Sequence, residues 1–427
     1  MGDILIKGGK VFCYKNGIDG EELDIFISDG KVVEVGRNLK CKYEIDARGM
    51  YVFPGFIDLH VHLREPGGEN KETIDTGTRA AAKGGITTVV AMANTTPRID
   101  SPEVYFDVIS RISRKAVVNV IQSGNATKGM EGREITEMGL MKNLGCYIFT
   151  DDGKPISDAK VMHRVLTYAK NFDVLVFEHP EEVSLSENGV INQGRKSLEL
   201  GLQGIPNCSE SIAVARNILL VQETNSYIHL QHISTKESVE LIRWAKKEGI
   251  NITSEATPHH LILTDDSITS HLDTNKKMNP PLRSEEDRRA LVEALKDGTI
   301  DVIATDHAPH TKFEKSLTIQ EAPFGTIGLE TALPVLYTYL VKTNEISLLQ
   351  LVKLFSYNPS RILRLKDKGH LSVGSDADIT IFDPNSESII AEDFFVSKSK
   401  NSCFIGLRVE GKVRYTICSG KLVWSDI

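Results

Sequence analysis

The chain has 427 residues, of which 41% are hydrophobic and 25% are charged, and this ordinary globular composition excludes a disordered or fibrous protein. Because the chain is longer than one core usually supports, we expect a large catalytic domain and a smaller second domain. A formal net charge of −8 and a pI near 5.9 disfavour a nucleic-acid partner, which needs clustered Lys and Arg, and predict a small-molecule substrate.

The cysteines and the ends of the chain indicate the compartment. The six cysteines are scattered without a CxxC pair, which disfavours both a disulfide framework and a thiolate zinc site and predicts reduced thiols. The first residues show neither a charged leader with an apolar run nor a myristoylation signal, and no stretch reaches the roughly 18 apolar residues of a membrane span. We therefore expect a cytoplasmic protein without a membrane anchor.

Three regions follow one another along the chain. Residues 1–51 predict short antiparallel strands, with Asp29-Gly30 as a hairpin turn between two apolar runs. Residues 52–365 alternate apolar strands with helical periods such as 238–249 and 285–298, and about eight such units predict a (β/α)₈ TIM-type barrel. Residues 366–427 return to short β structure. We expect both ends to form one small β-sandwich module beside the barrel.

The clearest chemical signal is a pair of histidines, His60 and His62, in an apolar strand-like run. Because side chains alternate along a strand, both imidazoles point to the same face. A barrel strand would present them at its C-terminal mouth, where barrel active sites lie. For such a pair alone, two buried histidines satisfied by hydrogen bonds are an equally good interpretation.

Further polar residues at the ends of predicted strands favour a metal site. They are Asp151 and Asp152, His179, His232 and Asp306. Together with the strand of His60 and His62, five apolar strands end in such groups, which would be costly as a plain core because buried polar groups need partners. Imidazole and carboxylate together are ligands of Zn²⁺. One bridging carboxylate would let six side chains hold two ions, and water held between them would ionise near neutral pH to give the nucleophile.

Other catalytic chemistries have weaker support. The sequence has no GxSxG elbow, and Cys208 lacks the strand-to-turn context of an activated thiol. The common Gly-rich phosphate loops are also missing. A metal-activated water is therefore favoured over a nucleophilic serine or cysteine.

Nine motifs, in order along nearly the whole chain, carry a family resemblance: PGFIDLHVHLREPG, ANTTP, FTDDG, EHP, LQHIS, EATPHH, MNPPLR, ATDHAPH and FGTIGLET. With these motifs the chain resembles the amidohydrolase superfamily, and more closely its bacterial type I dihydroorotase family. The resemblance implies a zinc-dependent cyclic amidohydrolase that reversibly cyclises N-carbamoyl-L-aspartate to L-dihydroorotate in pyrimidine (UMP) biosynthesis.

The resemblance also implies a set of ligands for two zinc ions per chain. These are His60 and His62 on the more buried zinc, His179 and His232 on the second, Asp152 as the bridge, and Asp306. Asp306 is further implied as the general acid/base that works with a zinc-held hydroxide. Many relatives bridge with a carboxylated lysine, and its absence here favours the aspartate-bridged type over hydantoinase. The choice of Asp152 over Asp151 rests on resemblance alone, because an extra aspartate in a turn is commonly a capping residue.

Six residues are implied to bind the substrate. Its carboxylate would lie against Arg64, Asn94 and His310, and its ring amides against Asn279 and the backbone of Phe324 and Gly325. Arg64 shares the face of His62, and a planar guanidinium suits a carboxylate. Alternatively, Arg64 is a surface residue that pairs with Glu65 or Glu69. Asn279 precedes a proline, which is also a common turn signal.

Several histidines are not assigned to the metal. We expect structural roles for His259 and His260, and His163, His229, His271 and His370 are interpreted as ordinary histidines. Ala93 replaces the first proline of the family motif PNTxP. This replacement affects the stiffness of the loop but changes no ligand.

Two alternative functions stay open. One is another cyclic-amide hydrolase, such as a hydantoinase or allantoinase, against which the pair Arg64 and Asn94 favours a substrate with a carboxylate. The other is a non-catalytic scaffold for aspartate transcarbamoylase, against which the complete ligand set counts. We expect a homo-oligomer, and a complete site is compatible with a transcarbamoylase complex as well.

Overall fold

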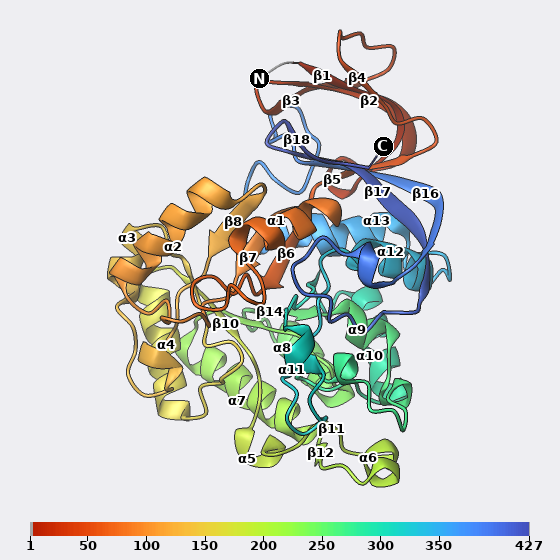
Figure 1. Cartoon of the computed structure of the whole chain (residues 1–427). Helices are drawn as coiled ribbons and strands as arrows, with labels where there is room; N and C mark the ends of the chain where they lie inside the picture. The colour runs from red at the N-terminus through yellow and green to blue at the C-terminus, as the bar shows by residue number, and fades with distance from the viewer. Residues whose placement is uncertain (1–2, 427) are drawn as a thin grey trace.

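The computed structural model describes residues 3–426, and eight parallel strands form a barrel at its centre (Figure 1). The barrel strands are β6 (Phe56–Val61), β7 (Ile86–Ala91), β8 (Asn119–Gln122), β9 (Ile148–Phe149), β10 (Leu175–Glu178), β13 (Ile228–Leu230), β14 (Ile252–Ala256) and β15 (Val302–Ile303). They pair in parallel as a run of three and a run of five. Parallel bridges Gly124–Phe149 and Val61–His307 join the two runs. The barrel is therefore closed, as expected.

Helices follow the barrel strands along the chain, and the longer ones cover the outside of the barrel, whereas α5 and α6 lie beside the small strands β11 and β12 (Figure 1). They are α1 (Ile74–Lys83), α2 (Pro102–Lys115), α3 (Met138–Asn143), α4 (Ala159–Asn171), α5 (Val183–Ser186), α6 (Arg195–Leu200), α7 (Cys208–Thr224), α8 (Lys236–Lys247), α9 (Pro258–Ile262), α10 (Glu285–Asp297), α11 (Lys312–Lys315), α12 (Ala332–Leu336), α13 (Leu348–Val352) and α14 (Asn358–Ile362). Two of them, α8 and α10, occupy the segments with predicted helical periods. The hydroxyls of Thr235 and Ser284 cap their N-termini by accepting backbone N–H bonds.

Both chain ends meet in a second sheet above the barrel (Figure 1). Its strands are β1 (Ile4–Cys13), β2 (Ile18–Ser28), β3 (Lys31–Gly36), β4 (Glu44–Asp46), β5 (Tyr51–Pro54), β16 (Ile379–Ile389), β17 (Arg408–Cys418) and β18 (Lys421–Ser425). The order is β18-β17-β16-β5-β1-β2-β3, with β4 beside β1. The predicted hairpin joins β2 to β3, and Asp29 and Gly30 both have positive φ, as a tight hairpin turn requires. A further small pair, β11 (Ile191–Asn192) with β12 (Gly204–Ile205), lies outside both sheets.

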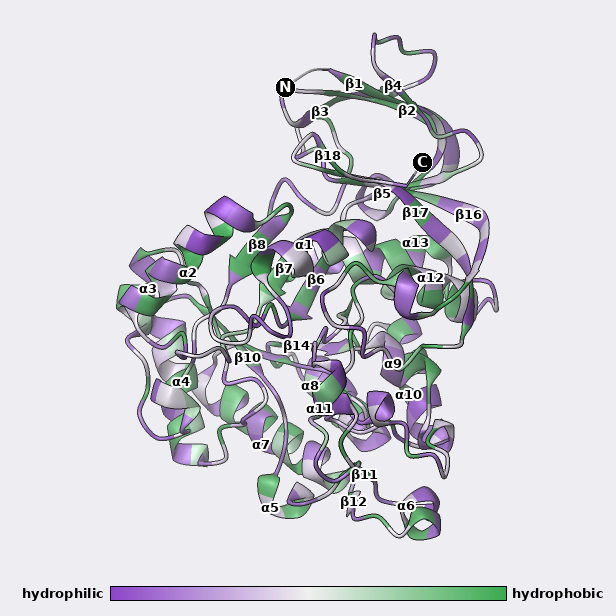
Figure 2. Ribbon diagram, in the orientation of Figure 1, coloured by the Kyte–Doolittle hydropathy of each residue, from purple (hydrophilic) through white to green (hydrophobic). Residues whose placement is uncertain are grey.

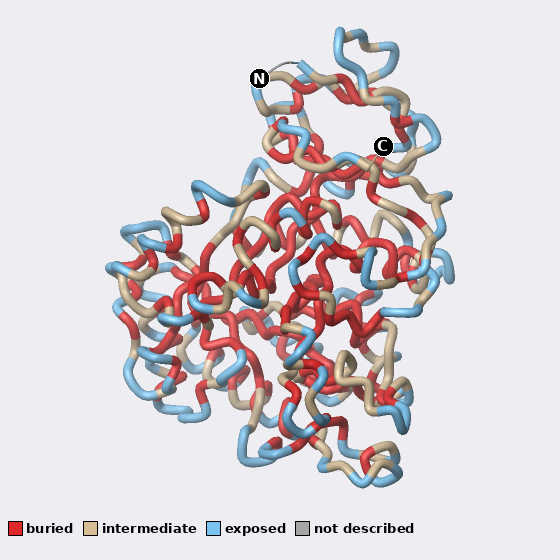
Figure 3. The backbone as a smooth tube through the Cα atoms, in the orientation of Figure 1, coloured by how far each residue is buried: buried red, intermediate tan, exposed pale blue. Residues whose placement is uncertain are grey.

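Apolar side chains fill both parts of the molecule. Hydrophobic residues colour the barrel strands and the layers of the sandwich in Figure 2, and the same segments are buried in Figure 3. The sandwich has its own core around Ile6, Ile25 and Ile379. Its lower layer also contributes Phe53 and Phe382 to the large core shared with the barrel.

This fold agrees with the predicted TIM-type barrel and β-sandwich. The domain boundaries after residues 51 and 365 stay predictions. Near the first of them, β5 (Tyr51–Pro54) belongs to the sandwich sheet and leads directly into the first barrel strand, β6. No helix within residues 3–426 is long and apolar enough to cross a membrane.

Candidate active site

The six predicted metal ligands meet at the C-terminal mouth of the barrel. His60 lies in β6 and the others follow the ends of strands: His62 after β6, Asp152 after β9, His179 after β10, His232 after β13 and Asp306 after β15. All six side chains are buried. Residues scattered over the sequence converge because the carboxyl ends of parallel barrel strands share one mouth.

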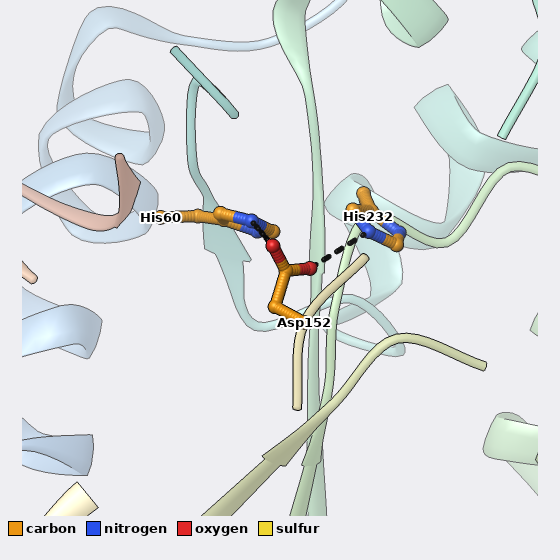
Figure 4. A group of neighbouring side chains, drawn as sticks. All are labelled: His60, Asp152 and His232. Carbon is orange, nitrogen blue, oxygen red and sulfur yellow. Dashed lines mark ion pairs between the residues drawn. The ribbon is translucent and has the colours of Figure 1, made fainter. Parts of the chain in front are cut away.

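The carboxylate of Asp152 lies between two pairs of imidazoles. Its Oδ2 is 3.3 Å from His60 Nε2 and 3.4 Å from His62 Nε2. Its Oδ1 is 3.6 Å from His232 Nε2 and 3.8 Å from His179 Nδ1. Figure 4 shows the two oxygens directed toward His60 and His232. One carboxylate thus faces both pairs, the arrangement that a bridging ligand needs.

Asp306 belongs to the first pair only. Its Oδ1 is 3.0 Å from His62 Nε2 and 3.5 Å from His60 Nε2. Asp306 and His232 both have positive φ, 47° and 32°, which is uncommon for residues other than glycine and is found at functional sites. Burial raises the pKa of the Asp306 carboxyl, but the charge of His60 and the hydrogen bond of His62 outweigh this and lower it. The imidazoles thus favour the ionised carboxylate of Asp306, which is the form that accepts a proton.

The residues at this mouth fit a metal ion. The donor atoms of His60, Asp152 and His232, and those of His60, His62 and Asp306, lie within 4.8 Å of one another. The buried Nε2 of His60 has no hydrogen-bond partner. Ligand atoms around a tetrahedral zinc at ~2.0–2.1 Å lie about 3.3–3.4 Å apart. The separations of 3.0 to 3.5 Å between the first imidazole pair and the two carboxylates match this spacing.

Two glutamates that the sequence analysis missed hold ligand imidazoles from outside. Glu255 Oε1, in β14, lies 2.8 Å from His60 Nδ1, and Glu181 Oε2 lies 2.9 Å from His179 Nε2. Such outer bonds select which ring nitrogen faces a metal. Burial raises the pKa of Glu255, but His60 and His229 more than offset it and lower the pKa to about 2. Both glutamates stand inside or next to family motifs, EATPHH and EHP, which was the available signal.

Asp151, the rejected alternative to Asp152, has a different place. Its Oδ1 accepts the backbone N–H groups of Ala126 and Thr127 at 2.9 and 3.1 Å, and its Oδ2 accepts the Thr127 hydroxyl. Burial raises the pKa of Asp151 to about 6. Asp151 thus ties the loop after β8 to the loop after β9, whereas Asp152 faces the imidazoles.

Arg64 lies beside His310 at the edge of the same mouth. Its Nε donates to the carbonyl of Pro309 at 3.1 Å, and its Nη2 is 3.4 Å from His310 Nε2. Among residues 3–426 no carboxylate forms an ion pair with Arg64; Glu65 pairs with Arg111 and Lys115 instead. Burial lowers the pKa of Arg64 to about 10. A desolvated guanidinium without a carboxylate partner is suited to an anionic ligand.

Asn94 contacts two of the predicted metal ligands. Its Oδ1 is 3.0 Å from His62 Nδ1, and its Nδ2 donates to the carbonyl of Asp152 at 3.3 Å. The structure therefore gives Asn94 an orienting contact to His62 in addition to the substrate contact that the resemblance implies.

Two of the three residues predicted to meet the substrate ring, Asn279 and Phe324, line one cavity. Asn279 and Phe324, with Glu181 and Lys277, line a cavity of about 530 Å³. Asn279 Nδ2 donates to Glu181 Oε2 at 3.1 Å. The carbonyl of Phe324 lies 2.8 Å from His310 Nε2, and the N–H of Gly325 donates to the carbonyl of Lys277. The Oδ1 of Asn279 and the second lone pair of the Phe324 carbonyl can still accept hydrogen bonds from a ring amide at this place.

The remaining buried histidines differ from one another. His260 Nδ1 lies 2.8 Å from the Thr257 hydroxyl and its Nε2 lies 2.9 Å from the carbonyl of Pro280, which fits the expected structural role. His259 Nε2 is buried without a hydrogen-bond partner. His229, interpreted from the sequence as an ordinary histidine, contacts Glu255.

Curated relatives match almost the whole chain. A protein named dihydroorotase from Caldanaerobacter subterraneus subsp. tengcongensis is 48% identical over 422 residues, covering 98% of this chain and 96% of that protein. One from Geobacillus sp. is 47% identical over 424 residues, covering 99% and 98%. The chain belongs to the dihydroorotase family. The family models agree, since a Dihydro-orotase-like model matches residues 49–238 and an Amidohydrolase family model matches residues 223–424.

Solved structures related to this dihydroorotase-family chain share its architecture. The L-hydantoinase (dihydropyrimidinase) from Arthrobacter aurescens has a TM-score of 0.89 at 26% identity and covers 100% of this chain and 96% of its own. A D-hydantoinase has a TM-score of 0.86 at 27% identity, covering 99% and 95%. The barrel with a sandwich from both chain ends is thus shared within the amidohydrolases.

Proposed function

We propose that this member of the dihydroorotase family cyclises N-carbamoyl-L-aspartate to L-dihydroorotate reversibly, at a centre of two zinc ions held by the six ligands named above. One observation supports the proposal most strongly. Within residues 3–426, the same barrel mouth holds the Asp152 carboxylate between four imidazoles and the Arg64 guanidinium, which has no carboxylate partner. The family membership supports the reaction. The chain is accordingly a cyclic amidohydrolase.

The proposed roles of the side chains follow from their places. Zinc at this centre would supply Lewis acidity, which lowers the pKa of water and polarises a carbonyl oxygen. Arg64 and His310 bind the substrate carboxylate and thereby direct the scissile ring amide toward Asp152 and Asp306. Asn279 offers its amide to the ring from the opposite side of the mouth.

Asp306 moves the proton. In ring opening, its carboxylate accepts a proton from the attacking water, the carbonyl carbon gains an oxygen, and the carbon–nitrogen bond breaks. Asp306 then returns the proton to the departing nitrogen. Ring closure reverses these steps: Asp306 takes the proton from the attacking nitrogen and delivers it to the departing oxygen.

The second candidate function is hydrolysis of a neutral cyclic amide, and the resemblance in fold to hydantoinases favours it. The unpaired, desolvated Arg64 disfavours it, because a neutral ring would leave that charge uncompensated. A non-catalytic scaffold role is disfavoured by the convergence of all six ligands.

One experiment tests the proposal directly. Metal analysis of the purified chain is combined with turnover on dihydroorotate, hydantoin and allantoin. We expect zinc and a preference for dihydroorotate. A chain with zinc that prefers a neutral ring would be another cyclic-amide hydrolase, and a chain without metal or turnover would favour the scaffold. Two zinc ions per chain, homo-oligomerisation, a complex with aspartate transcarbamoylase and a cytoplasmic location stay predictions.

A further inference from the structure

A continuous line of hydrogen bonds crosses the barrel core behind His60. Its Nδ1 lies 2.8 Å from Glu255 Oε1, and Glu255 Oε2 lies 3.1 Å from His229 Nε2. His229 Nδ1 lies 2.8 Å from the hydroxyl of Thr253, which lies 2.5 Å from the hydroxyl of Tyr227. The side chains of His60, Glu255 and His229 are fully buried. These groups therefore find their partners within the protein and not in water.

A metal-ligating His60 must be a neutral imidazole. When His229 also carries a single proton and Glu255 is a carboxylate, the line of hydrogen bonds permits one arrangement of protons. Both carboxylate oxygens can then only accept, so His60 Nδ1 and His229 Nε2 each donate a proton to Glu255. The second nitrogen of neutral His229 accepts from Thr253, whose oxygen accepts from Tyr227. His60 then keeps the lone pair on Nε2, the atom that lies between Asp152 and Asp306 without a hydrogen-bond partner.

A second group, the side-chain amide of Gln231, also lies next to Nδ1 of His60. The amide Nε2 of Gln231 lies 3.1 Å from the same Nδ1 of His60. If that amide donated to Nδ1, the proton of His60 would sit on Nε2 and block a metal. The charged Glu255, at the shorter distance, makes the stronger bond and decides the tautomer.

Glu255 also contacts the second imidazole pair. Its Oε1 accepts the backbone N–H of His232 at 3.3 Å, where the backbone takes the unusual positive φ of 32°. The same carboxylate therefore orients the ring of one proposed ligand and the backbone of another.

We infer that Glu255 and His229 are positioning residues, which hold His60 in the tautomer that presents Nε2 to the metal. The inference rests on the proposed metal site and adds to it two residues that contact no substrate. His229 acts through Glu255, because it holds the second carboxylate oxygen and keeps the first directed at His60.

The far end of the line is accessible from the opposite mouth. Tyr227 and Thr253 line a cavity of about 540 Å³ together with Asn251 and Asp301, and these residues lie at the beginnings of β13, β14 and β15. Tyr227→Phe and Thr253→Val thus perturb the line from outside the metal mouth.

The experiment measures the tautomer of His60 in the metal-free full chain by nitrogen NMR of labelled histidines, at a pH high enough for the ring to carry a single proton. The wild type should carry its proton on Nδ1. Glu255→Gln and His229→Gln should shift population toward the Nε2-protonated form, and in chelator competition they should weaken zinc binding by about 10–100-fold. The matched control is Glu181→Gln, which removes the carboxylate behind His179 and should leave the His60 tautomer unchanged.

A double variant separates positioning from mere packing. Because His229 acts through Glu255, Glu255→Gln with His229→Gln should bind zinc no more weakly than Glu255→Gln alone, whereas independent packing losses would add. Should Glu255→Gln fail to fold, Thr253→Val and Tyr227→Phe give the same readouts, with a smaller shift expected in the same direction.

The outcomes are distinguishable from failure of the proposed function. If the wild type binds zinc but the variants keep both the wild-type tautomer of His60 and the wild-type affinity for zinc, this inference alone is overturned. Additive losses in the double variant would also overturn it. A wild-type chain that binds no zinc would overturn the proposed function, and the inference with it.

Discussion

At the scale of single residues, the position of Asp306 determines its chemistry. Its Oδ1 faces both imidazoles of the first pair, so it can touch a metal and still exchange a proton with a water beside it. We predict that Asp306→Asn retains much of the bound metal, because four imidazoles and Asp152 remain. Turnover should fall by about 10²-fold or more, the scale of a lost general acid/base. Metal analysis with dihydroorotate assays checks this; near-normal turnover would contradict the role.

The adjacent aspartates should behave differently when each is replaced by alanine. Asp152→Ala removes the carboxylate between both imidazole pairs, so we expect loss of at least one metal ion and of activity. Asp151→Ala removes a clamp on the backbone of Ala126 and Thr127, so metal should stay while stability falls by about 1–3 kcal/mol, the cost of unsatisfied buried donors. Metal content and urea unfolding of both variants distinguish the residues. The opposite pattern of metal loss would show that the wrong aspartate was chosen.

Arg64 tests the substrate class. If its guanidinium binds the carboxylate of dihydroorotate, Arg64→Met should lower kcat/KM for that substrate. The loss should correspond to roughly 2–5 kcal/mol of transition-state stabilisation, because a desolvated charge loses its partner. Zinc content should hardly change, since Arg64 lies against Pro309 and His310 rather than at the metal. Kinetics and metal analysis on the same preparation make the comparison. Unimpaired turnover of dihydroorotate would refute the assignment.

At the scale of elements, two buried lysines support the segment that carries Phe324 and Gly325. Lys277 Nζ donates to the carbonyl of Ala322 at 2.6 Å and lies 4.5 Å from the centre of the Phe324 ring. Lys315 Nζ donates to the carbonyl of Pro323 at 2.9 Å. Backbone carbonyls thus replace carboxylates as partners of these two ammonium groups, and they hold the segment against the cavity.

This pairing predicts a pH-dependent stability. Burial, helped by the charge of Lys277, lowers the pKa of Lys315 from 10.5 to about 7. Between these values the unfolded chain binds more protons than the folded chain, so this group makes the free energy of unfolding rise with pH above about 7. Below about 7 both states are protonated and the full cost of burying the charge remains.

Lys315→Met should remove that slope. We expect the free energy of unfolding of the wild type, relative to Lys315→Met, to increase between about pH 7 and about pH 9.5. Urea unfolding of both proteins at the two pH values measures the difference. A difference that stays constant or shrinks would show that Lys315 is not buried as a weakened base; Lys312→Met, on the exposed side of the same helix, is the control.

At the scale of the whole molecule, the sandwich and the barrel share one core. Phe53 of β5 packs against Phe56 of β6 and against Phe382 of β16, within one core. Because the interface is large and apolar, we expect the two parts to unfold as one cooperative unit. Trp244, on α8, reports on the barrel, and Trp424, on β18, reports on the sandwich where it packs against the shared core.

A substitution at Gly411, in β17, tests whether the sandwich and the barrel unfold together. Gly411 has a φ of 85°, and a Cβ there would overlap the ring of Phe382. Gly411→Ala should therefore lower the free energy of unfolding by about 1–3 kcal/mol. Fluorescence of Trp244→Phe and Trp424→Phe backgrounds should show the same shift in midpoint. A shift seen only by Trp424 would mean that the sandwich unfolds independently.

The sequence by itself determined the barrel, the sandwich and the hairpin at Asp29-Gly30. These depend on local periodicity, turn chemistry and the alternation of strands with helices, which a single chain displays directly. It also determined which strand ends carry imidazoles and carboxylates, and the convergence of His60 with Asp306 follows from the rule that parallel strands share a mouth.

Only the tertiary structure decided the contacts between groups from different strands. It turned Asp152 toward four imidazoles and Asp151 toward a loop, though the two are neighbours with the same side chain. It placed Glu255 behind His60 and gave His229, which looked ordinary in the sequence, its contact with that carboxylate. Hydrogen bonds of this kind depend on angles and distances across the closed barrel, and no spacing along one strand encodes which neighbour a side chain will meet.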